Sequence, residues 1–299
     1  VEILKLLFRD SRVLILDEPT AVLTPQECDD FFRRLRELKA EGRTILIITH
    51  KLAEVMAVTD AVTVMRAGKT VARFVTSQTS VPLLAEAMVG HAMDLDAVAK
   101  EIRAKSFGPV VAEMTGPMSL QVHAGEILGI AGVDGNGQHE LIHALVASRR
   151  AAHAVNPVGW VPADRHSEGL LLERAVAQNM LLGHSRAARF LSPRRWLGIQ
   201  WLNFSAIRAE VARLMERFDV RPRDPRRLAG RFSGGNQQKI VIGRELVAAP
   251  PFLVVAQPTR GVDVGAIELI HREILKAREG GAGILLVSSE LDEVLALSD

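Results

Sequence analysis

The sequence has one cysteine, no tyrosine and a net charge of only +2 among its 299 residues. A lone cysteine, Cys28, excludes an internal disulfide and suits a reducing compartment. The small net charge argues against nucleic acid as a partner. No apolar stretch approaches the roughly 18 residues that a membrane-spanning helix requires. The chain also has no secretory signal and no initiator methionine, and it opens in a helical pattern at Val1, so we expect a fragment of a longer protein.

The residues that are present are those of an ordinary globular protein. Hydrophobic residues make up 48% and charged residues 24% of the chain. The length is enough for about two domains. Apolar runs at 13–16 and 284–287 have the length of buried strands.

An internal repeat relates the two ends of the chain. Residues 1–60 align with residues 240–299 at a constant offset of 239, without a gap, so that Pro19 falls on Pro258. Each copy reads as helix, apolar strand, polar turn, helix, glycine, apolar strand and helix. Strands without alternation, separated by helices, predict an α/β fold with a mainly parallel sheet covered on both faces.

The two copies differ in what surrounds them. The first continues into a predicted strand at 61–64 and a turn at Ala67-Gly68, whereas the second stops at Asp299. A charged connector at 94–105 precedes the region that leads into the second copy. We therefore expect two similar domains in tandem, cut at both ends.

A glycine-rich loop lies between an apolar strand at 127–131 and a helical pattern at 140–147. Converging backbone N–H groups and a helix N-terminus form a cradle for phosphate. The glycines fit the Walker A spacing GxxxxGK[ST], but Gln138 replaces the lysine and His139 the Ser or Thr. A tight strand–helix turn without a ligand fits the same residues. The candidate loop residues are Gly132, Asp134, Gly135, Asn136, Gly137, Gln138 and His139.

Two adjacent carboxylates, Asp17 and Glu18, follow the strand at 13–16. This is the Walker B arrangement, in which Asp17 would hold Mg²⁺ and Glu18 would orient or deprotonate the attacking water. The next strand ends in His50, placed to contact a γ-phosphate. A solvated helix start, where carboxylates are favoured, is the better explanation of an isolated Asp-Glu pair.

The second copy has neutral residues at these positions: Ala256, Gln257 and Ser289. The surrounding apolar pattern is unchanged, and packing gives no reason for replacing only the ionisable groups. A duplicated ATPase with one weakened site would show this pattern.

The segment Ser233, Gly234, Gly235, Asn236 and Gln237 directly precedes the second copy and opens a predicted helix. Ser233 is a good N-cap, and the N–H groups of the glycines form another anion site. The order and spacing of these motifs resemble the ATPases of ABC transporters, whose signature is LSGGQ. Phe232 stands for the Leu of that signature and Asn236 for its final Gln.

Five ordered motifs carry this resemblance over nearly the whole chain. Together they look like the double-cassette ATPases of importers for simple sugars and, more closely, for nucleosides. They are LDEPTAVLTPQE (16–27), IITH (47–50), GVDGNGQ (132–138), FSGGNQQK (232–239) and AQPTRGVDVGA (256–266).

The resemblance implies a tandem P-loop NTPase fold of the ABC-ATPase type with a helical subdomain. Residues 1–94 would be the C-terminal part of the first cassette and 95–108 a linker. Residues 109–299 would be the second cassette, degenerate in Walker A and Walker B and lacking its C-terminal end.

Cassettes of this family pair head to tail, and this pairing implies one competent site and one degenerate site. Asp17, Glu18 and His50 would face Ser233 to Gly235 in the competent site, whose own Walker A would lie upstream of Val1. The degenerate site would bind nucleotide at most. We expect the isolated chain to be inactive.

The resemblance further implies a function in uptake. ATP and Mg²⁺ would be the cofactors, and hydrolysis would drive import through transmembrane permease subunits supplied by a substrate-binding lipoprotein. A helical region at 172–231 would dock on the permease. The protein would lie peripherally on the cytoplasmic face of the plasma membrane.

Some features depart from the family pattern and leave alternatives open. Pro162-Ala163-Asp164-Arg165 stands where the family has Pro-Glu-Asp-Arg, the segment before it is short, and no adenine-stacking aromatic residue is evident. A catalytically silent cassette fragment is one alternative. A soluble double-cassette ATPase acting on ribosomes is another, against which Ala256, Gln257 and the short connector count.

Overall fold

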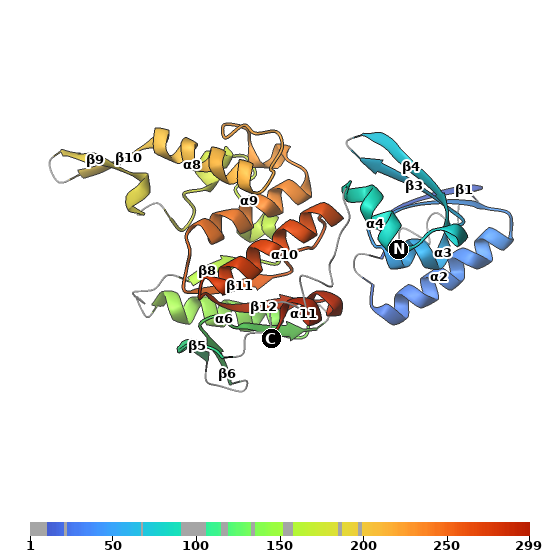
Figure 1. Cartoon of the computed structure of the whole chain (residues 1–299), viewed down its shortest axis with the longest axis horizontal. Coiled ribbons are helices and arrows are strands. Elements are labelled where there is room, and N and C mark those ends of the chain that lie inside the picture. Colours follow the sequence, from blue (N-terminus) through green and yellow to red (C-terminus); the bar gives the residue numbers. More distant parts are fainter. Residues whose placement is uncertain are drawn as a thin grey trace. The chain divides into compact units, whose positions relative to one another are not determined.

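The computed structural model describes residues 11–20, 23–66, 68–90, 106–114, 119–132, 135–151, 158–184, 187–196 and 199–299. The chain divides into two compact units (Figure 1). The first comprises Val1–Asp94 with Asp263–Gly265, and the second Leu95–Val262 with Ala266–Asp299. The connector predicted at 94–105 lies outside the described residues.

The first unit combines a two-stranded parallel sheet with an antiparallel hairpin, β3–β4. Helix α2 begins at a capping box, in which Thr24 and Glu27 satisfy each other's backbone N–H groups. The described elements are β1 (Val13–Asp17), α2 (Pro25–Ala40), β2 (Thr44–Ile48), α3 (Leu52–Val58), β3 (Ala61–Arg66), β4 (Lys69–Val75), η1 (Thr76–Gln78) and α4 (Val81–Val89).

The second unit is built on a four-stranded parallel sheet in the order β7-β12-β11-β8, as the buried apolar runs predict. Its described elements are β5 (Val110–Met114), β6 (Leu120–His123), β7 (Ile127–Ala131), α6 (Gln138–Ala151), β8 (Val158–Val161), η2 (Arg165–Gly169), α7 (Val176–Asn179), η3 (Ala188–Phe190), β9 (Leu191–Trp196), β10 (Ile199–Leu202), α8 (Phe204–Arg217), η4 (Ala229–Arg231), α9 (Gly234–Val247), β11 (Phe252–Ala256), α10 (Val264–Glu279), β12 (Gly283–Ser288) and α11 (Leu291–Leu297).

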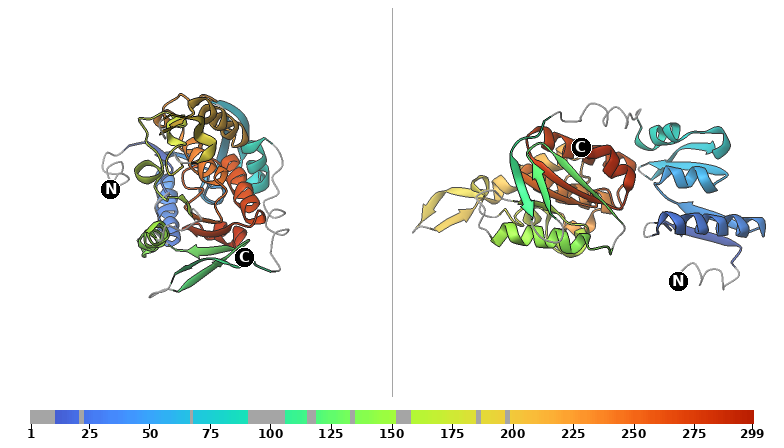
Figure 2. Two further views of the ribbon diagram at one scale, coloured as in Figure 1. Left: turned by 90° about the vertical axis from the view of Figure 1, so that its left-hand side faces the viewer. Right: turned by 90° about the horizontal axis from the view of Figure 1, so that it is seen from below.

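Both faces of this sheet are covered. Helix α6 and the β5–β6 hairpin pack on one face, around Leu145, Val122 and Val254. Helices α8, α9 and α10 pack on the other, where Ile240 and Ile270 meet alternate residues of the same strands (Figure 2). The carboxyl ends of the strands therefore remain the accessible edge at which loops gather.

The internal repeat extends to the boundaries of the elements. When 239 is added to the residue numbers, the first and last residues of β1, α2 and α3 coincide with those of β11, α10 and α11. Strand β12 is one residue longer than β2 at its carboxyl end. The strand register is also shared: Val13 lies opposite Thr44, and Phe252 lies opposite Gly283. The two copies are thus the same substructure.

The first copy differs in burial. The sequence predicts strands covered on both faces, but β1 alternates between buried and exposed residues. Ile15 is 61% exposed and Leu46 53% exposed, whereas Leu285, the counterpart of Leu46, is fully buried. Helix α2 covers one face of this two-stranded sheet, through Phe32 packed on Leu16, and the other face is apolar and open.

The structure of the 172–231 region differs from the helical region that the sequence predicts. It is predicted as helical, yet residues 191–196 and 199–202 form the antiparallel strands β9 and β10, which project from the second unit in Figure 1 and Figure 2. Pro193 explains the difference, since proline removes a helical hydrogen bond. Trp201 and Phe204 are exposed. Helix α8 buries one apolar face, formed by Ile207, Val211, Leu214 and Met215.

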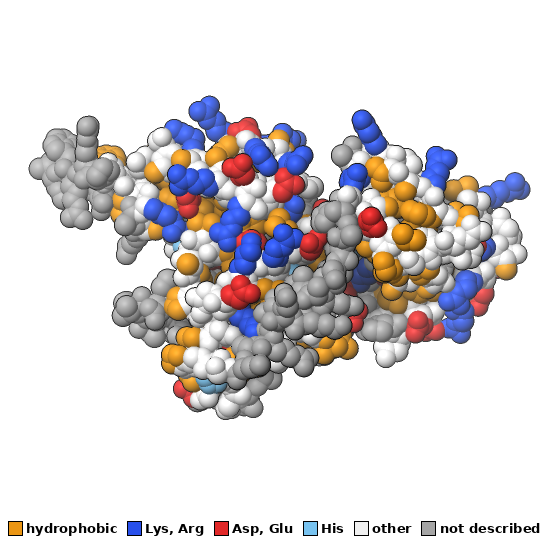
Figure 3. Space-filling view, viewed as in Figure 1, with side chains coloured by type: hydrophobic (Ala, Val, Ile, Leu, Met, Phe, Trp, Pro, Cys, Tyr) orange, Lys and Arg blue, Asp and Glu red, His pale blue; other side chains and the backbone are white. Residues whose placement is uncertain are grey.

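Among the described residues, no helix has both the length and the apolar character to span a membrane. Basic and acidic side chains are interspersed on the visible face of the second unit (Figure 3). The ion pairs of this unit include Arg217 with the buried Glu273, and Arg272 with Glu268.

Candidate functional site

The predicted catalytic carboxylates lie at the carboxyl end of β1. Asp17 is the last residue of the strand, opposite Ile48, and both Asp17 and Glu18 are exposed. Glu18 has a φ of 43°, and its N–H donates to the carbonyl of Ile48 at 2.8 Å. A positive φ costs a non-glycine residue of order 1–3 kcal/mol and is found most often where function fixes the backbone.

His50 meets Glu18 directly. Its Nδ1 donates to Oε1 of Glu18 at 3.0 Å, and the two side chains are 21% and 43% exposed. Behind this pair, the buried carboxylate of Glu54 accepts hydrogen bonds from Thr20 and Thr49. The turn between strand and helix is therefore tied to the end of β2, which holds Glu18 and His50 in contact.

This edge fits Mg²⁺ by its donor chemistry. Mg²⁺ prefers oxygen ligands and in phosphate sites is held by one or two carboxylates. Asp17 and Glu18 present such carboxylates to solvent at the carboxyl end of a parallel strand.

The second copy repeats this backbone without its charges. Gln257 has a φ of 48°, and its N–H donates to the carbonyl of Val287 at 2.8 Å. Its Oε1 accepts from the N–H of Ser289 at 3.2 Å and from the hydroxyl at 3.1 Å. Ala256, the counterpart of Asp17, is buried. No carboxylate remains at these two positions, so they do not fit Mg²⁺.

The glycine-rich loop lies at the same edge of the sheet, because the N–H of Gly132 donates to the carbonyl of Ser288. Gly135 and Gly137 have φ values of 95° and 93°, which favour glycine, and α6 begins directly after them. The side chain of Gln138 folds back into the loop, where its Oε1 accepts from the N–H of Asn136 at 3.1 Å. One donor of the phosphate cradle is thus engaged within the protein. Asp134 lies outside the described residues.

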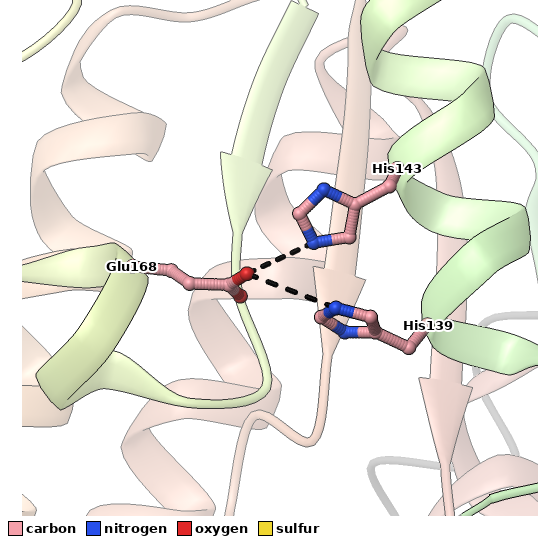
Figure 4. A group of neighbouring side chains, drawn as sticks. All are labelled: His139, His143 and Glu168. Carbon is pink, nitrogen blue, oxygen red and sulfur yellow. Dashed lines mark hydrogen bonds and ion pairs between the residues drawn. The ribbon is translucent and has the colours of Figure 1, made fainter.

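His139, in place of the Walker A hydroxyl, points toward two residues that the sequence reasoning missed. Its ring lies 4.1 Å from that of His143, and its Nε2 lies 3.9 Å from Oε1 of Glu168 on η2 (Figure 4). His143 contacts the same oxygen at 2.9 Å. The His-x-x-x-His spacing places both rings on one helix face and is a signal that could have found the first pair.

The signature segment opens helix α9 as predicted. Ser233 takes the N-cap conformation, but it makes no side-chain capping bond, and its hydroxyl instead accepts from Nδ2 of Asn236 at 2.9 Å. Gly235 and Gln237 are buried, and the Gln237 amide donates to the carbonyls at 229 and 232.

Arg165 covers the first signature glycine. A Cβ at Gly234 would lie 2.6 Å from Nη2 of Arg165, whose Nη1 donates to the carbonyl of Arg260 at 2.9 Å. Burial lowers the pKa of Arg165. The charge of Asp164 raises this pKa and the charge of Arg260 lowers it, and the net effect is a lowered pKa. This arginine of the Pro-Ala-Asp-Arg stretch therefore connects that stretch to the signature.

Comparison with known proteins identifies the family. A family model described as ABC transporter matches residues 115–260. The chain is 40% identical to the nucleoside import ATP-binding protein NupA of Lactococcus lactis, over 100% of the chain and 63% of NupA. The chain belongs to the ATP-binding proteins of ABC transporters.

Other relatives of this family are similar over the whole chain. Identity is 42% with the glucose import ATP-binding protein TsgD13 of Haloferax volcanii and 39% with the guanosine import ATP-binding protein NupO of Bacillus subtilis. The chain covers 59% and 63% of these two proteins. The chain therefore spans about three fifths of the length of these curated relatives.

Solved structures support the fold. The RNase-L Inhibitor matches with a TM-score of 0.61 at 17% identity, over 95% of this chain and 56% of that one. UvrA2 from Deinococcus radiodurans matches with a TM-score of 0.61 at 16% identity, over 96% and 47%. The predicted ABC-type P-loop fold is confirmed.

Proposed function

We propose that this chain is part of the ATP-binding and ATP-hydrolysing subunit of an importer for nucleosides or simple sugars. The observation that carries the catalytic half of this proposal is the contact between Glu18 and His50 at one of two otherwise equivalent sheet edges. The solute class is supported by relatives that import nucleosides, guanosine and glucose.

One competent and one degenerate site follow from this asymmetry. In the competent site Asp17 binds Mg²⁺, Glu18 orients the attacking water, and His50 holds Glu18 and reaches toward the γ-phosphate. Bound Mg²⁺ neutralises the charge that develops on the transferred phosphoryl group. The cassettes pair head to tail, so that Ser233 to Gly235 complete this site.

The degenerate site holds nucleotide without hydrolysing it. Gln138 replaces the Walker A lysine, and Gln257 replaces the catalytic carboxylate. The remaining glycine loop at 132–137 keeps donors for phosphate, although Gln138 competes for one of them. Residues 1–94 form the end of the first cassette, 95–108 the linker and 109–299 the second cassette.

The longer protein docks on transmembrane permease subunits at the cytoplasmic face of the plasma membrane, and a substrate-binding lipoprotein delivers solute to the permease. The part of the chain offered to the permease is the 172–231 region. In it, helix α8 is anchored in the core while Trp201 and Phe204 remain exposed.

Transport is tested with membrane vesicles that contain the longer protein and its permease. We expect ATP-dependent uptake of a labelled nucleoside or a labelled pentose, and loss of uptake in Glu18→Gln. Normal ATP hydrolysis with uptake of neither solute class would contradict the assignment. The Glu37→Gln variant, which alters an exposed glutamate on helix α2 outside the proposed site and outside the 172–231 region, is the matched control.

A further inference from the structure

A cluster of three potential metal ligands lies beside the degenerate phosphate loop. His139 and His143 are one helical turn apart on α6, and Glu168 faces them from η2 (Figure 4). Their ligand atoms all lie within 4.8 Å of one another. None of the roles assigned above explains why the two histidines converge on a single carboxylate.

The separations suit one shared ion. Zn–N and Zn–O bonds of about 2.0–2.1 Å in a tetrahedron place neighbouring ligand atoms about 3.3 Å apart. The two distances to Oε1 of Glu168, 2.9 Å from His143 and 3.9 Å from His139, lie on either side of that value. The ligand atoms all lie within 4.8 Å of one another, so the most distant pair must approach by at most about 1.5 Å, which rotation of the exposed His139 side chain can supply.

The chemistry of the ligands selects the metal. Two imidazoles and one carboxylate are a common protein ligand set for Zn²⁺, whereas Mg²⁺ prefers oxygen alone. His143 and Glu168 are half-buried and fix the site between α6 and η2, while His139 is 64% exposed at its rim. A fourth position therefore faces solvent, where water or an anionic group of a ligand can enter.

We propose that His139, His143 and Glu168 bind a divalent transition-metal ion of the zinc type. The ion links the first turns of α6, the helix of the phosphate loop, to η2, which carries Arg165 and borders the signature. It occupies the end of the degenerate loop where a Walker A hydroxyl would hold Mg²⁺. The site depends only on the second unit and stands whether or not the longer protein transports solutes.

The test is titration of the metal-free full chain with Zn²⁺ by calorimetry, and with Co²⁺ by visible absorption. We expect one ion per chain, d–d bands of tetrahedral Co²⁺, and no displacement by excess Mg²⁺. His139→Gln removes an exposed ligand without disturbing the core, so its folding is expected to be normal. It and Glu168→Gln are each expected to lower Zn²⁺ affinity at least about 100-fold, since even outer-shell changes cost 10–100-fold.

His123→Gln is the matched control, because His123 at the end of β6 pairs with Glu126, and among the described residues this pair belongs to no group of three potential metal ligands. Its Zn²⁺ affinity is expected to match that of the wild type. Zn²⁺ is also expected to raise the Tm of the wild type but not of His139→Gln. Absence of Zn²⁺ binding, or equal affinity in wild type and both ligand variants, would overturn the proposal and leave an ion pair between His143 and Glu168.

Discussion

Glu18 and Gln257 occupy the same backbone position in the two copies, with φ values of 43° and 48° and the same hydrogen bond to the end of the neighbouring strand. Their side chains differ by little more than one ionisable oxygen. The Glu18 carboxylate accepts from His50, whereas the Gln257 amide accepts from Ser289. A single isosteric substitution therefore separates a group that can activate water from one that cannot.

We expect Glu18→Gln to abolish ATP turnover by the longer protein while leaving ATP binding intact. The amide keeps the shape of the side chain but cannot accept a proton, and loss of a catalytic base typically costs 10²–10⁴-fold. Steady-state hydrolysis and equilibrium binding of ATP measure the two effects. Residual turnover above about a tenth of wild type would mean that the second site also hydrolyses ATP.

The reverse substitution, Gln257→Glu, is expected to leave turnover nearly unchanged. Groups of one catalytic site act as a unit, and Gln138 and Ala256 still lack the lysine and the Mg²⁺-binding carboxylate. The triple change Gln138→Lys, Ala256→Asp and Gln257→Glu is the smallest that can restore hydrolysis. ATP turnover is measured with each change introduced into the Glu18→Gln variant, which removes hydrolysis at the first site. Full ATP turnover from Gln257→Glu alone would refute the assignment of one competent and one degenerate site.

Among the elements, α9 buries an ion pair between two of its own residues, and each partner is hydrogen-bonded to another part of the second unit. The side chains of Arg244 and Glu245 are 6% and 8% exposed and meet at 2.7 Å. Arg244 also donates to the carbonyl of Gly169, and Glu245 accepts from the N–H of Trp160 on β8. Burial raises the pKa of Glu245, but His184 and Arg244 outweigh that effect and hold it below its usual value.

We expect Glu245→Ala to destabilise the chain by about 3–5 kcal/mol, because it leaves the Arg244 guanidinium buried without its partner. Chemical denaturation followed by circular dichroism measures the change. Glu216→Ala is the control, because Glu216 is 75% exposed and its contact with Arg223 is as long as 4.0 Å. We expect this substitution to change the free energy of unfolding by no more than about 0.5 kcal/mol. Equal losses in the two variants would show that the buried pair contributes nothing.

For the whole molecule, the first unit exposes an apolar sheet face, whereas the equivalent face in the second unit is buried. Val13 is 58% and Ile48 50% exposed, whereas Phe252 and Val287 at the matching positions are 2% and 3% exposed. The sequence also contains no glycine-rich loop with the Walker A lysine. The proposed competent site therefore has no Walker A lysine within these residues.

We expect the isolated 299-residue chain to show no measurable ATPase activity, because the lysine that meets the β- and γ-phosphates is missing. A coupled assay of phosphate release from the purified chain is the measurement. Hydrolysis that disappears in Glu18→Gln would contradict this expectation, whereas hydrolysis that persists in Glu18→Gln would indicate a contaminant.

The sequence by itself was sufficient for the family, the parallel sheet and the repeat. Motif order and the offset of 239 are properties of the chain in one dimension, and the neutral residues Ala256, Gln257 and Ser289 can be recognised by alignment with their charged counterparts. The helix start at Gly234 also followed from local signals, whereas α6 begins at Gln138, two residues before the predicted start at Glu140. The roles of these site residues remain predictions.

Only the tertiary structure decided which residues meet and which faces are covered. β1 and β11 both begin as runs of four apolar residues, yet β1 is half exposed and β11 fully buried, because burial depends on elements far away in the sequence. Pro193 argues against a helix, but the pairing of β9 with β10 was decided by the folded chain. Glu168 joins His139 and His143 because η2 lies against α6, and a contact between segments 25 residues apart arises from the folded chain rather than from any sequence period.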